Sequence, residues 1–410
     1  MSALFGGDGP DDSSDRSEAR DILKACVHCG FCNAVCPTYQ LLGDELDGPR
    51  GRIDLIKNLL EGQPTSRLTQ RHLDRCLTCR SCETTCPSGV RYGQLLDIGR
   101  AALEEQVPRP AVERLARFML RKVMTEPRRF AGLMALARIV KPALPARLRD
   151  RIPARARPPA TWPRVRHARR MLILDGCVQP VLAPSIDVAA ARVLGTLGIS
   201  LVRVPRGGCC GALSYHLGAR DEGRDHMRRV IDACWAWIEQ GAEALVSTAS
   251  GCGVMLKEYG HALREDPEYA DKAARLAAMT RDIAEVLAAE DLSALARATG
   301  HRIAFQAPCT LQHGQKLGGV VEGILDRLGY ELTPVANAHL CCGSAGTYSL
   351  LQRDLSERLR DDKLEALQRH RPDGIATANI GCLMHLQGRA GVPLRHWIEL
   401  LADNLPLGSA

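Results

Sequence analysis

The sequence predicts a multidomain α+β protein, in which an α-helical N-terminal domain precedes two duplicated α/β domains with mainly parallel sheets. Three observations lead to this prediction. Two short cysteine runs lie near the N-terminus, a cysteine pattern recurs about 130 residues apart in the C-terminal half, and apolar runs alternate with helical stretches there. A chain of 410 residues that is 45% hydrophobic is long enough to form several cores.

The chain is predicted to divide into five segments. The first 25 residues are polar and acidic, which favours disorder at the start and does not fit a secretory signal peptide. No apolar run approaches the roughly 20 residues of a membrane-spanning helix. The expected segments are a disordered N-terminus, a helical domain, an Arg-rich helical segment with a Pro-rich linker, and two cysteine-rich α/β domains, at 1–20, 21–108, 109–168, 169–298 and 299–405.

Two short cysteine runs in the helical domain predict iron–sulfur chemistry. "CVHCGFCNAVCP" begins at Cys26 and "CLTCRSCETTCP" at Cys76, and both read C-x2-C-x2-C-x3-C-P. This is the bacterial ferredoxin pattern, in which three close thiolates bind one 4Fe–4S cluster and the fourth reaches the other cluster. We therefore expect two 4Fe–4S clusters, one bound by Cys26, Cys29, Cys32 and Cys86, and the other by Cys76, Cys79, Cys82 and Cys36.

Zinc is the alternative metal for these runs. Four-cysteine zinc sites usually consist of two C-x2-C pairs rather than a triplet followed by C-P. Two full copies of the triplet pattern therefore favour iron–sulfur clusters. His28 lies between two predicted ligands and is expected to be a surface or hydrogen-bonding residue instead of a ligand.

The segment between the two runs predicts the type of ferredoxin domain. Cys36 and Cys76 are 40 residues apart, further than in compact ferredoxins. "GRIDLIKNLLEG" places apolar residues on one helical face and ends at Gly62, and a second apolar-periodic stretch spans Leu68 to Leu73. The spacing is analogous to the helical ferredoxin domain in the iron–sulfur subunit of succinate dehydrogenase. The apolar face of the first helix consists of Ile53, Ile56, Leu59 and Leu60.

The C-terminal half contains an internal duplication. Three pairs of cysteines are separated by 132 residues and a fourth pair by 130, which is too regular for chance. The first copy contains Cys177, Cys209, Cys210 and Cys252, and the second contains Cys309, Cys341, Cys342 and Cys382. Cys234 has no counterpart in the second copy, so we expect it to be a core residue.

Each copy has an α/β pattern that brings its cysteines together. One predicted strand ends at the first cysteine, a second leads to a CCG triplet, and a third ends at the last cysteine, with helical stretches between them. The carboxyl ends of parallel strands meet at one edge of a sheet, where open α/β sheets bind ligands. We therefore treat the eight cysteines as candidate ligands of further iron–sulfur clusters, with glycines that allow a close backbone approach. Buried structural thiols are the alternative.

Residues 109–170 are strongly basic. They contain sixteen arginines and two lysines against three acidic residues, a local net charge of +15 in a chain whose total is +7. A basic amphipathic helix is typical of contact with a membrane surface or an acidic partner, whereas a solvated linker is the alternative. We expect no nucleic-acid binding. The apolar residues with helical spacing are Val112, Leu115, Ala116, Met119 and Val123.

These motifs together resemble the family of glycolate oxidase (glycolate dehydrogenase) iron–sulfur subunits. The resemblance extends from about residue 20 to 400 and includes "HLDRCLTCRSCETTCPSGVRYGQLLDIGR", "HLCCGSAGTYSL", "TANIGC" and "RHWIEL". It implies an electron-transfer subunit in a complex that oxidises glycolate to glyoxylate. FAD would be bound only by partner subunits, and electrons would pass toward the respiratory quinone pool. The implied location is cytoplasmic, peripheral on the inner (plasma) membrane.

Other functions remain as alternatives. In heterodisulfide reductases each CCG region ends in C-x2-C, but Met255 and His385 occupy the position of the fifth cysteine here. This difference argues against a thiol–disulfide catalytic subunit, and His385 is not expected to be a ligand. An iron–sulfur subunit of a glycerol-3-phosphate or lactate dehydrogenase is a further alternative. We predict no catalytic residue in this chain, because no dinucleotide fingerprint, P-loop or H-E-x-x-H motif is present.

Overall fold

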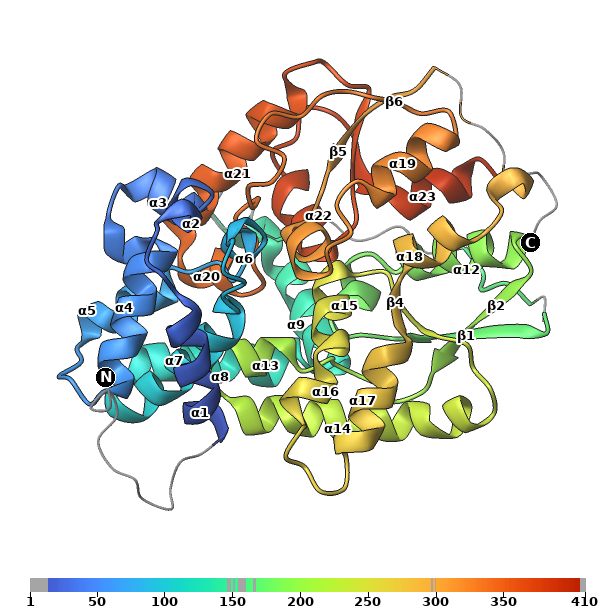
Figure 1. Ribbon diagram of the computed structural model, residues 1–410. Helices are drawn as coiled ribbons and strands as arrows, with labels where there is room; N and C mark the ends of the chain where they lie inside the picture. Colours follow the sequence, from blue (N-terminus) through green and yellow to red (C-terminus); the bar gives the residue numbers. More distant parts are fainter. Residues whose placement is uncertain are drawn as a thin grey trace.

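A helical domain lies beside two four-stranded parallel sheets in the computed structural model, and this confirms the predicted fold class (Figure 1). The two sheets lie side by side, with helices on their faces, and the N-terminal domain packs at one end of the pair. The structure describes residues 14–145, 149, 152–153, 160–164, 167–295, 298 and 300–405.

The N-terminal domain is built from short helices around the two cysteine runs. Helix α4 matches the helix predicted between the runs, and Ile53, Ile56 and Leu59 form its buried face. It begins at Pro49, whose fixed φ suits the first helical position, and packs against α7. The elements are α1 (Ser14–Ala25), α2 (Phe31–Ala34), α3 (Pro37–Leu42), η1 (Glu45–Asp47), α4 (Pro49–Leu60), α5 (Arg67–Asp74), α6 (Ser81–Thr85) and α7 (Tyr92–Gln106).

Helix α1 corrects the prediction that residues 1–20 are disordered. Residues 14–20 form the first half of this helix, whereas residues 1–13 lie outside the described residues. Ala19 and Ile22 are buried and pack in the core of the N-terminal domain. The polar composition of this segment suggested disorder. The prediction failed because the partners of its acidic side chains are distant in the sequence and could not be recognised from it.

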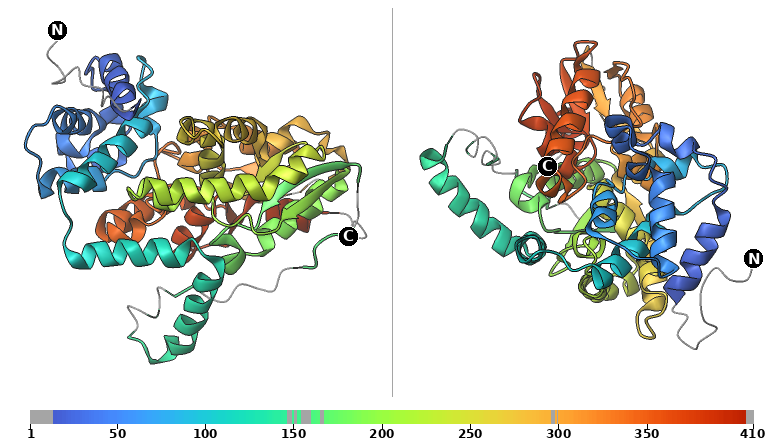
Figure 2. Two further views of the ribbon diagram at one scale, coloured as in Figure 1. Left: turned by 90° about the horizontal axis from the view of Figure 1, so that it is seen from below. Right: turned by 90° about the vertical axis from the view of Figure 1, so that its left-hand side faces the viewer.

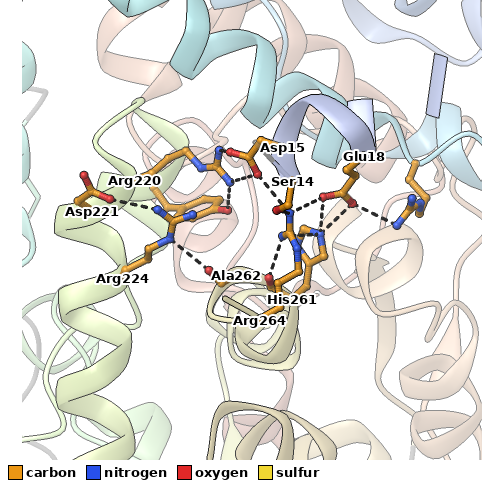
Figure 3. A network of polar contacts seen from close by, with 11 residues as sticks. Ser14, Asp15, Glu18, Arg220, Asp221, Arg224, His261, Ala262 and Arg264 are labelled. Atoms are coloured by element: carbon orange, nitrogen blue, oxygen red, sulfur yellow. Dashed lines mark hydrogen bonds and ion pairs between the residues drawn. The ribbon is translucent and has the colours of Figure 1, made fainter. Parts of the chain in front are cut away.

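Those partners belong to the first α/β domain (Figure 3). Asp15 accepts hydrogen bonds from Arg220 and, at 3.2 Å, from Arg264. Glu18 lies 2.9 Å from Nε2 of His261 and 3.1 Å from Arg264. Burial opposes ionisation of Asp15, but the two arginines outweigh it and hold the pKa of this carboxyl below its usual value. Charge-assisted hydrogen bonds therefore hold α1 against the α/β domain.

Removing these charges should loosen α1. We expect the double substitution Asp15→Asn with Glu18→Gln to reduce the protection of α1 amides by about 1–3 kcal/mol, the range for hydrogen bonds to charged groups. Amide hydrogen exchange measures this directly. Asp21→Asn is the matched control, because Asp21 is exposed and pairs with Lys24 on the same helix. Equal exchange rates in α1 of all three proteins would contradict the prediction.

The first α/β domain has the strand order β2-β1-β3-β4, with all neighbours parallel. Its strands and helices follow the pattern predicted from the sequence. The elements are β1 (Arg169–Leu174), α11 (Gln179–Leu182), α12 (Ser185–Thr196), β2 (Ile199–Val204), α13 (Ala212–His216), α14 (Arg220–Glu239), β3 (Leu245–Ser247), α15 (Ser250–Lys257), α16 (Tyr259–Ala262), α17 (Ala270–Met279), β4 (Thr280–Asp282), α18 (Ile283–Ala289) and η3 (Leu292–Ala294).

The second α/β domain repeats this topology in the order β6-β5-β7-β8. In both domains the last strand leads into a helix through a capping box, formed by Asp282 with Glu285 and by His396 with Glu399. The elements are β5 (Arg302–Gln306), η4 (Thr310–Gly314), α19 (Val320–Arg327), β6 (Glu331–Leu332), α20 (Tyr348–Leu351), α21 (Arg353–Gln368), β7 (Gly374–Thr377), α22 (Ile380–Gln387), β8 (Leu394–His396) and α23 (Trp397–Asp403).

The two α/β domains share one hydrophobic core. A single cluster of buried residues runs from Met171 to Leu405, with α12 packed against α23 and α18 against α19. His396 Nε2 also lies 2.9 Å from the carbonyl oxygen of Thr248. Because helices of one domain pack against helices of the other, the duplicated domains form one packed unit.

The Arg-rich segment forms two helices, α8 (Ala111–Met124) and α9 (Pro127–Val140), followed by η2 (Lys141–Ala143). Helix α9 extends away from the body of the protein (Figure 2). Most of the Pro-rich linker that follows lies outside the described residues. Among the described helices, none is both long enough and apolar enough to cross a membrane.

Candidate metal centres

The two N-terminal cysteine runs have the same backbone conformation. His28 and Gly30 have φ values of 53° and 83°, and Thr78 and Arg80, at the matching positions, have values of 53° and 61°. Positive φ is uncommon for residues other than glycine and costs free energy, so three such residues indicate a conformation fixed by the surroundings. Left-handed residues in such loops make concavities of backbone N–H groups that bind anionic groups. The shape of both runs thus suits iron–sulfur clusters.

Each run contributes to a pocket that also contains the last cysteine of the other run. The predicted ligand sets are brought together as the exchanged pattern requires, and the two pockets adjoin because Cys82 lines both. The first pocket is lined by Cys26, Cys29, Cys32, Cys86 and Cys82, and the second by Cys36, Cys76, Cys79 and Cys82.

The arrangement of the sulfur atoms suits a polynuclear group better than a single ion. Among the described residues, no three cysteine sulfurs lie within 4.8 Å of one another. A single zinc ion would hold four sulfurs at about 2.3 Å, which requires them to be much closer together. The donor set therefore fits an iron–sulfur cluster, and the zinc alternative does not match this geometry.

Burial strongly disfavours the bare thiolates. It raises the pKa of the Cys79 and Cys82 thiols well above the usual range, and it raises the pKa of Cys32 to about 11. A cluster needs thiolate ligands, so binding would displace these protons. When bound, it would supply one-electron redox chemistry, while the cysteines would provide its fixed attachment.

Positive and polar groups surround the second pocket. The buried Arg52 donates from Nε to the carbonyl oxygen of His72 at 2.8 Å, and its Nη1 lies 4.0 Å from Cys36 Sγ. The Tyr92 hydroxyl lies 3.6 Å from Cys76 Sγ. Hydrogen bonds and positive charge near cluster sulfurs raise the reduction potential of a cluster.

The first pocket differs because it opens at the surface. Cys29 is exposed, and the apolar side chains of Val27 and Phe31 beside it are 69% and 62% exposed. His28 is also exposed, as expected from the sequence. Of the two pockets, the first is therefore the one accessible to another protein.

The duplicated cysteines also come together. In each α/β domain the four thiols lie near one another in chain order, Cys177–Cys209–Cys210–Cys252 in the first and Cys309–Cys341–Cys342–Cys382 in the second. The Cys309 and Cys341 sulfurs are 3.8 Å apart. The first three cysteines of each set follow strand ends, and the last lies in the first turn of α15 or α22. We call these the first and second cysteine sets.

The glycine of each CCG triplet lies close to the backbone of a helix. Gly211 and Gly343 have φ values of 87° and 88°, a left-handed conformation that favours glycine. A Cβ atom would lie 2.7 Å from the carbonyl oxygen of Gly223 in the first case and 2.6 Å from that of Ser356 in the second. In both domains this glycine therefore permits a close approach of the backbone of the next helix.

Two further residues lie outside these sets. Cys234 is fully buried in α14 and packs in the core. The His385 imidazole contacts Ser356 at 3.2 Å, through both the carbonyl and the hydroxyl oxygen. The sequence did not indicate Arg52 or Tyr92 as site residues, because basic and aromatic side chains with ordinary helical spacing carry no motif.

Comparison with known proteins agrees with this geometry. The 4Fe-4S dicluster domain family matches residues 22–90, and the cysteine-rich domain family matches residues 171–257 and 303–387. The chain is 53% identical over 388 residues to the glycolate oxidase iron-sulfur subunit of Escherichia coli (strain K12), which covers 95% of both chains. This chain belongs to the glycolate oxidase iron–sulfur subunit family. The resemblance noted in the sequence is confirmed.

More distant relatives match different lengths of this chain. The probable glycolate oxidase iron-sulfur subunit of Bacillus subtilis (strain 168) is 30% identical over 408 residues, covering 91% of this chain and 90% of that protein. Lactate utilization protein A of Geobacillus thermodenitrificans (strain NG80-2) is 33% identical over 240 residues, covering 55% of this chain and 95% of that protein. The glycolate oxidase subunits therefore match this chain over the greater length.

Proposed function

We propose that this chain is the electron-carrying subunit of a flavin-dependent glycolate dehydrogenase complex. The observation that supports this most strongly is the pair of adjoining pockets, each lined by one complete set of predicted 4Fe–4S ligands. Two neighbouring clusters suit the stepwise removal of single electrons from a two-electron donor such as a reduced flavin. FAD is bound by partner subunits, where glycolate is oxidised to glyoxylate, and the electrons pass on to a quinone-type acceptor.

Electrons from the partner flavin enter at the first pocket. Exposed Cys29 with the flanking Val27 and Phe31 gives a partner protein an apolar contact surface directly beside the predicted cluster ligands. The second pocket, with buried Arg52 beside Cys36, has the groups that attract an electron inward. The path therefore runs from the exposed to the buried cluster.

The test uses the full chain, purified without oxygen, together with its flavoprotein partners. We expect at least about eight iron atoms per chain, from two clusters of four, and electron paramagnetic resonance (EPR) signals of two interacting clusters on reduction. Glycolate should reduce both clusters when the partners are present and not when they are absent. Reduction by lactate but not by glycolate would instead favour a lactate dehydrogenase complex.

We propose that helices α8 and α9 bind the cytoplasmic face of an anionic membrane. Several of their apolar residues face solvent, and Val112 and Ile139 are 79% and 75% exposed. Arg114, Arg128 and Arg129 are exposed on the same two helices. An apolar stripe bordered by positive charge is the pattern of interfacial helices on anionic lipids. The exposed apolar residues are Val112, Leu115, Phe118, Met119, Leu133, Leu136, Ile139 and Val140.

Replacing part of this stripe should release the protein from lipid. We expect Leu133→Gln, Leu136→Gln and Ile139→Gln together to weaken binding to anionic vesicles by more than about tenfold, since burying one such side chain is worth about 1.5–3 kcal/mol. Vesicle sedimentation measures the loss. Leu350→Gln is the matched control, because Leu350 is a 59% exposed leucine on α20. Unchanged binding of the triple variant would remove the membrane role and leave a protein contact.

A further inference from the structure

The second α/β domain packs against the second ferredoxin pocket. One hydrophobic cluster contains residues of both domains. Leu77 and Cys79 line the pocket, and the second α/β domain contributes Cys341, Tyr348 and Leu359 to the same cluster. Helix α21 packs against α3 and η4 against α6, and α20 lies next to the N-terminal domain (Figure 1). Side chains of the second α/β domain therefore lie close to the predicted ligands of this pocket.

Polar contacts fix this junction. Thr84, two residues before the last cysteine of the second run, has its Oγ1 2.9 Å from Nδ1 of His313. The other ring nitrogen of His313 lies 2.9 Å from the carbonyl oxygen of His339. Arg358 on α21 donates to the carbonyl oxygen of Leu41 at 3.3 Å. The second α/β domain is thus held at a defined position on the ferredoxin domain.

Tyr348 brings a hydroxyl group into this apolar contact. It is the first residue of α20, and its side chain is only 6% exposed. Its hydroxyl oxygen has no hydrogen-bond partner among the described residues. Buried tyrosine hydroxyls usually have a partner, because a buried polar group without one costs free energy. The position of this hydroxyl therefore indicates an acceptor that is not part of the polypeptide.

The groups whose charge acts on this hydroxyl point to the second pocket. They include Arg52 and the Cys76 thiol, which line the pocket, and Asp47, which pairs with Arg52. The Cys341 thiol, in the same hydrophobic cluster as Tyr348, acts on it as well. Burial raises the pKa of the Tyr348 phenol above its usual value, so the group stays protonated and can donate. The sulfur atoms of a negatively charged cluster would be suitable acceptors.

The corresponding tyrosine of the first α/β domain has a protein partner. In each domain one tyrosine lies between the CCG triplet and the long helix that follows, Tyr215 in α13 and Tyr348 in α20. Both side chains are 6% exposed. Arg220 donates to the Tyr215 hydroxyl at 3.0 Å and also pairs with Asp15 on α1. The duplicated domains therefore differ at this position, and the second leaves its tyrosine hydroxyl available to another group.

We propose that the Tyr348 hydroxyl donates a hydrogen bond to a sulfur of the second ferredoxin cluster and raises the reduction potential of that cluster. This inference rests on the proposed function, which assigns a cluster to the second pocket. A hydrogen bond to a cluster sulfur stabilises the reduced, more negative form more than the oxidised form. The second α/β domain thus sets the potential of a cluster whose ligands belong to the ferredoxin domain. This role does not depend on what the cysteines of the second α/β domain bind.

Two other tyrosines allow a controlled test. The Tyr92 hydroxyl belongs to the ferredoxin domain and lies 3.6 Å from Cys76 Sγ, so it serves as a reference for an effect on the second cluster. Tyr330 is a buried tyrosine of the second α/β domain, and its hydroxyl donates to the carbonyl oxygen of Leu400 at 3.0 Å. It serves as the control, because it has the same side chain in the same domain with a partner in the polypeptide.

The experiment compares the phenylalanine variants of these three tyrosines in the full chain, purified without oxygen. Each variant keeps the aromatic ring and every cysteine. We expect Tyr348→Phe to lower the midpoint potential of one ferredoxin cluster, the same cluster that Tyr92→Phe affects, whereas Tyr330→Phe should change neither potential. Redox titration followed by EPR measures both potentials. Electron–nuclear double resonance in H2O and D2O should show that Tyr348→Phe loses an exchangeable proton coupled to that cluster.

Several results would overturn the inference. Unchanged potentials in Tyr348→Phe would leave Tyr348 as a packing residue, and a shift in the cluster that Tyr92→Phe does not affect would assign its hydroxyl to the wrong cluster. An equal shift in Tyr330→Phe would mean that the effect is not specific. A loss of iron from Tyr348→Phe would also contradict the inference, since a hydrogen bond that only tunes a cluster is not needed to hold it.

These outcomes leave the proposed function intact, because two clusters are still present in the wild-type protein. A wild-type content below about eight iron atoms, from fewer than two clusters of four, would instead refute the proposed function, and the inference with it.

Discussion

Cys86→Ser is expected to remove about four iron atoms per chain and to stop the reduction of this subunit by its flavoprotein partners. Cys86 ends the second cysteine run, but it lines the pocket formed by the first run. The cluster that is lost should therefore be the exposed one, at which the electrons of the partner enter. Iron analysis together with EPR spectra of the reduced protein measures the loss.

Double substitutions test the exchange of ligands between the runs. Cys29→Ser and Cys86→Ser affect the same pocket, so the double variant should lose no more iron than either single variant. Cys29→Ser with Cys36→Ser affects both pockets and should lose about eight iron atoms. The iron losses of two substitutions should not add when both substitutions remove the same cluster. They should add when the substitutions affect different clusters.

Cys234→Ser is the matched control for these variants. It is the same substitution at a fully buried cysteine, but Cys234 lies in α14 among apolar residues of the first α/β domain. It should retain the full iron content. If Cys29→Ser with Cys86→Ser lost about eight iron atoms, each run would bind its own cluster and the exchanged assignment would be wrong.

The sequence predicted the elements whose signals are local. The spacing of Ile53, Ile56 and Leu59 places α4, and the apolar runs before Cys177 and Cys309 place β1 and β5. The repeated cysteine pattern predicted that the second α/β domain has the same elements as the first. Each of these features depends on residues a few positions apart, or on a repeated pattern, so one sequence suffices.

The features that the sequence did not predict depend on contacts between distant residues. The charges of Asp15 and Glu18 resemble a solvated terminus until Arg220 and Arg264 are placed beside them. The shared core of the α/β domains also depends on such contacts. The sequence drew attention to the glycine of each CCG triplet, but it could not show that the backbone of a distant helix lies against it.

Asp47 illustrates the same limit and gives the second large expected effect. Within "GDELDGPRGR" it resembles an ordinary turn residue, yet its side chain is fully buried. One carboxylate oxygen lies 3.4 Å from Arg52 and 3.0 Å from Nδ1 of His72, and the other lies 2.7 Å from Arg75. The carboxylate therefore neutralises a buried arginine that lies next to the predicted cluster ligand Cys36.

Asp47→Asn should destabilise the N-terminal domain by about 3–5 kcal/mol, because it keeps the shape of the side chain but leaves the Arg52 charge buried without its partner. Denaturant unfolding, followed by the loss of cluster absorbance, measures this change. The exposed Asp54 on α4 provides the control, and Asp54→Asn should change stability by less than about 0.5 kcal/mol.

A second readout separates the role of the charge from that of packing. With its counter-charge removed, Arg52 acts more strongly on Cys36, which should raise the midpoint potential of the buried cluster and leave that of the exposed cluster unchanged. A loss of stability with both potentials unchanged would mean that Arg52 only supports the fold. A shift confined to the buried cluster would show that the Asp47–Arg52 pair also sets the potential difference that draws electrons inward from the surface.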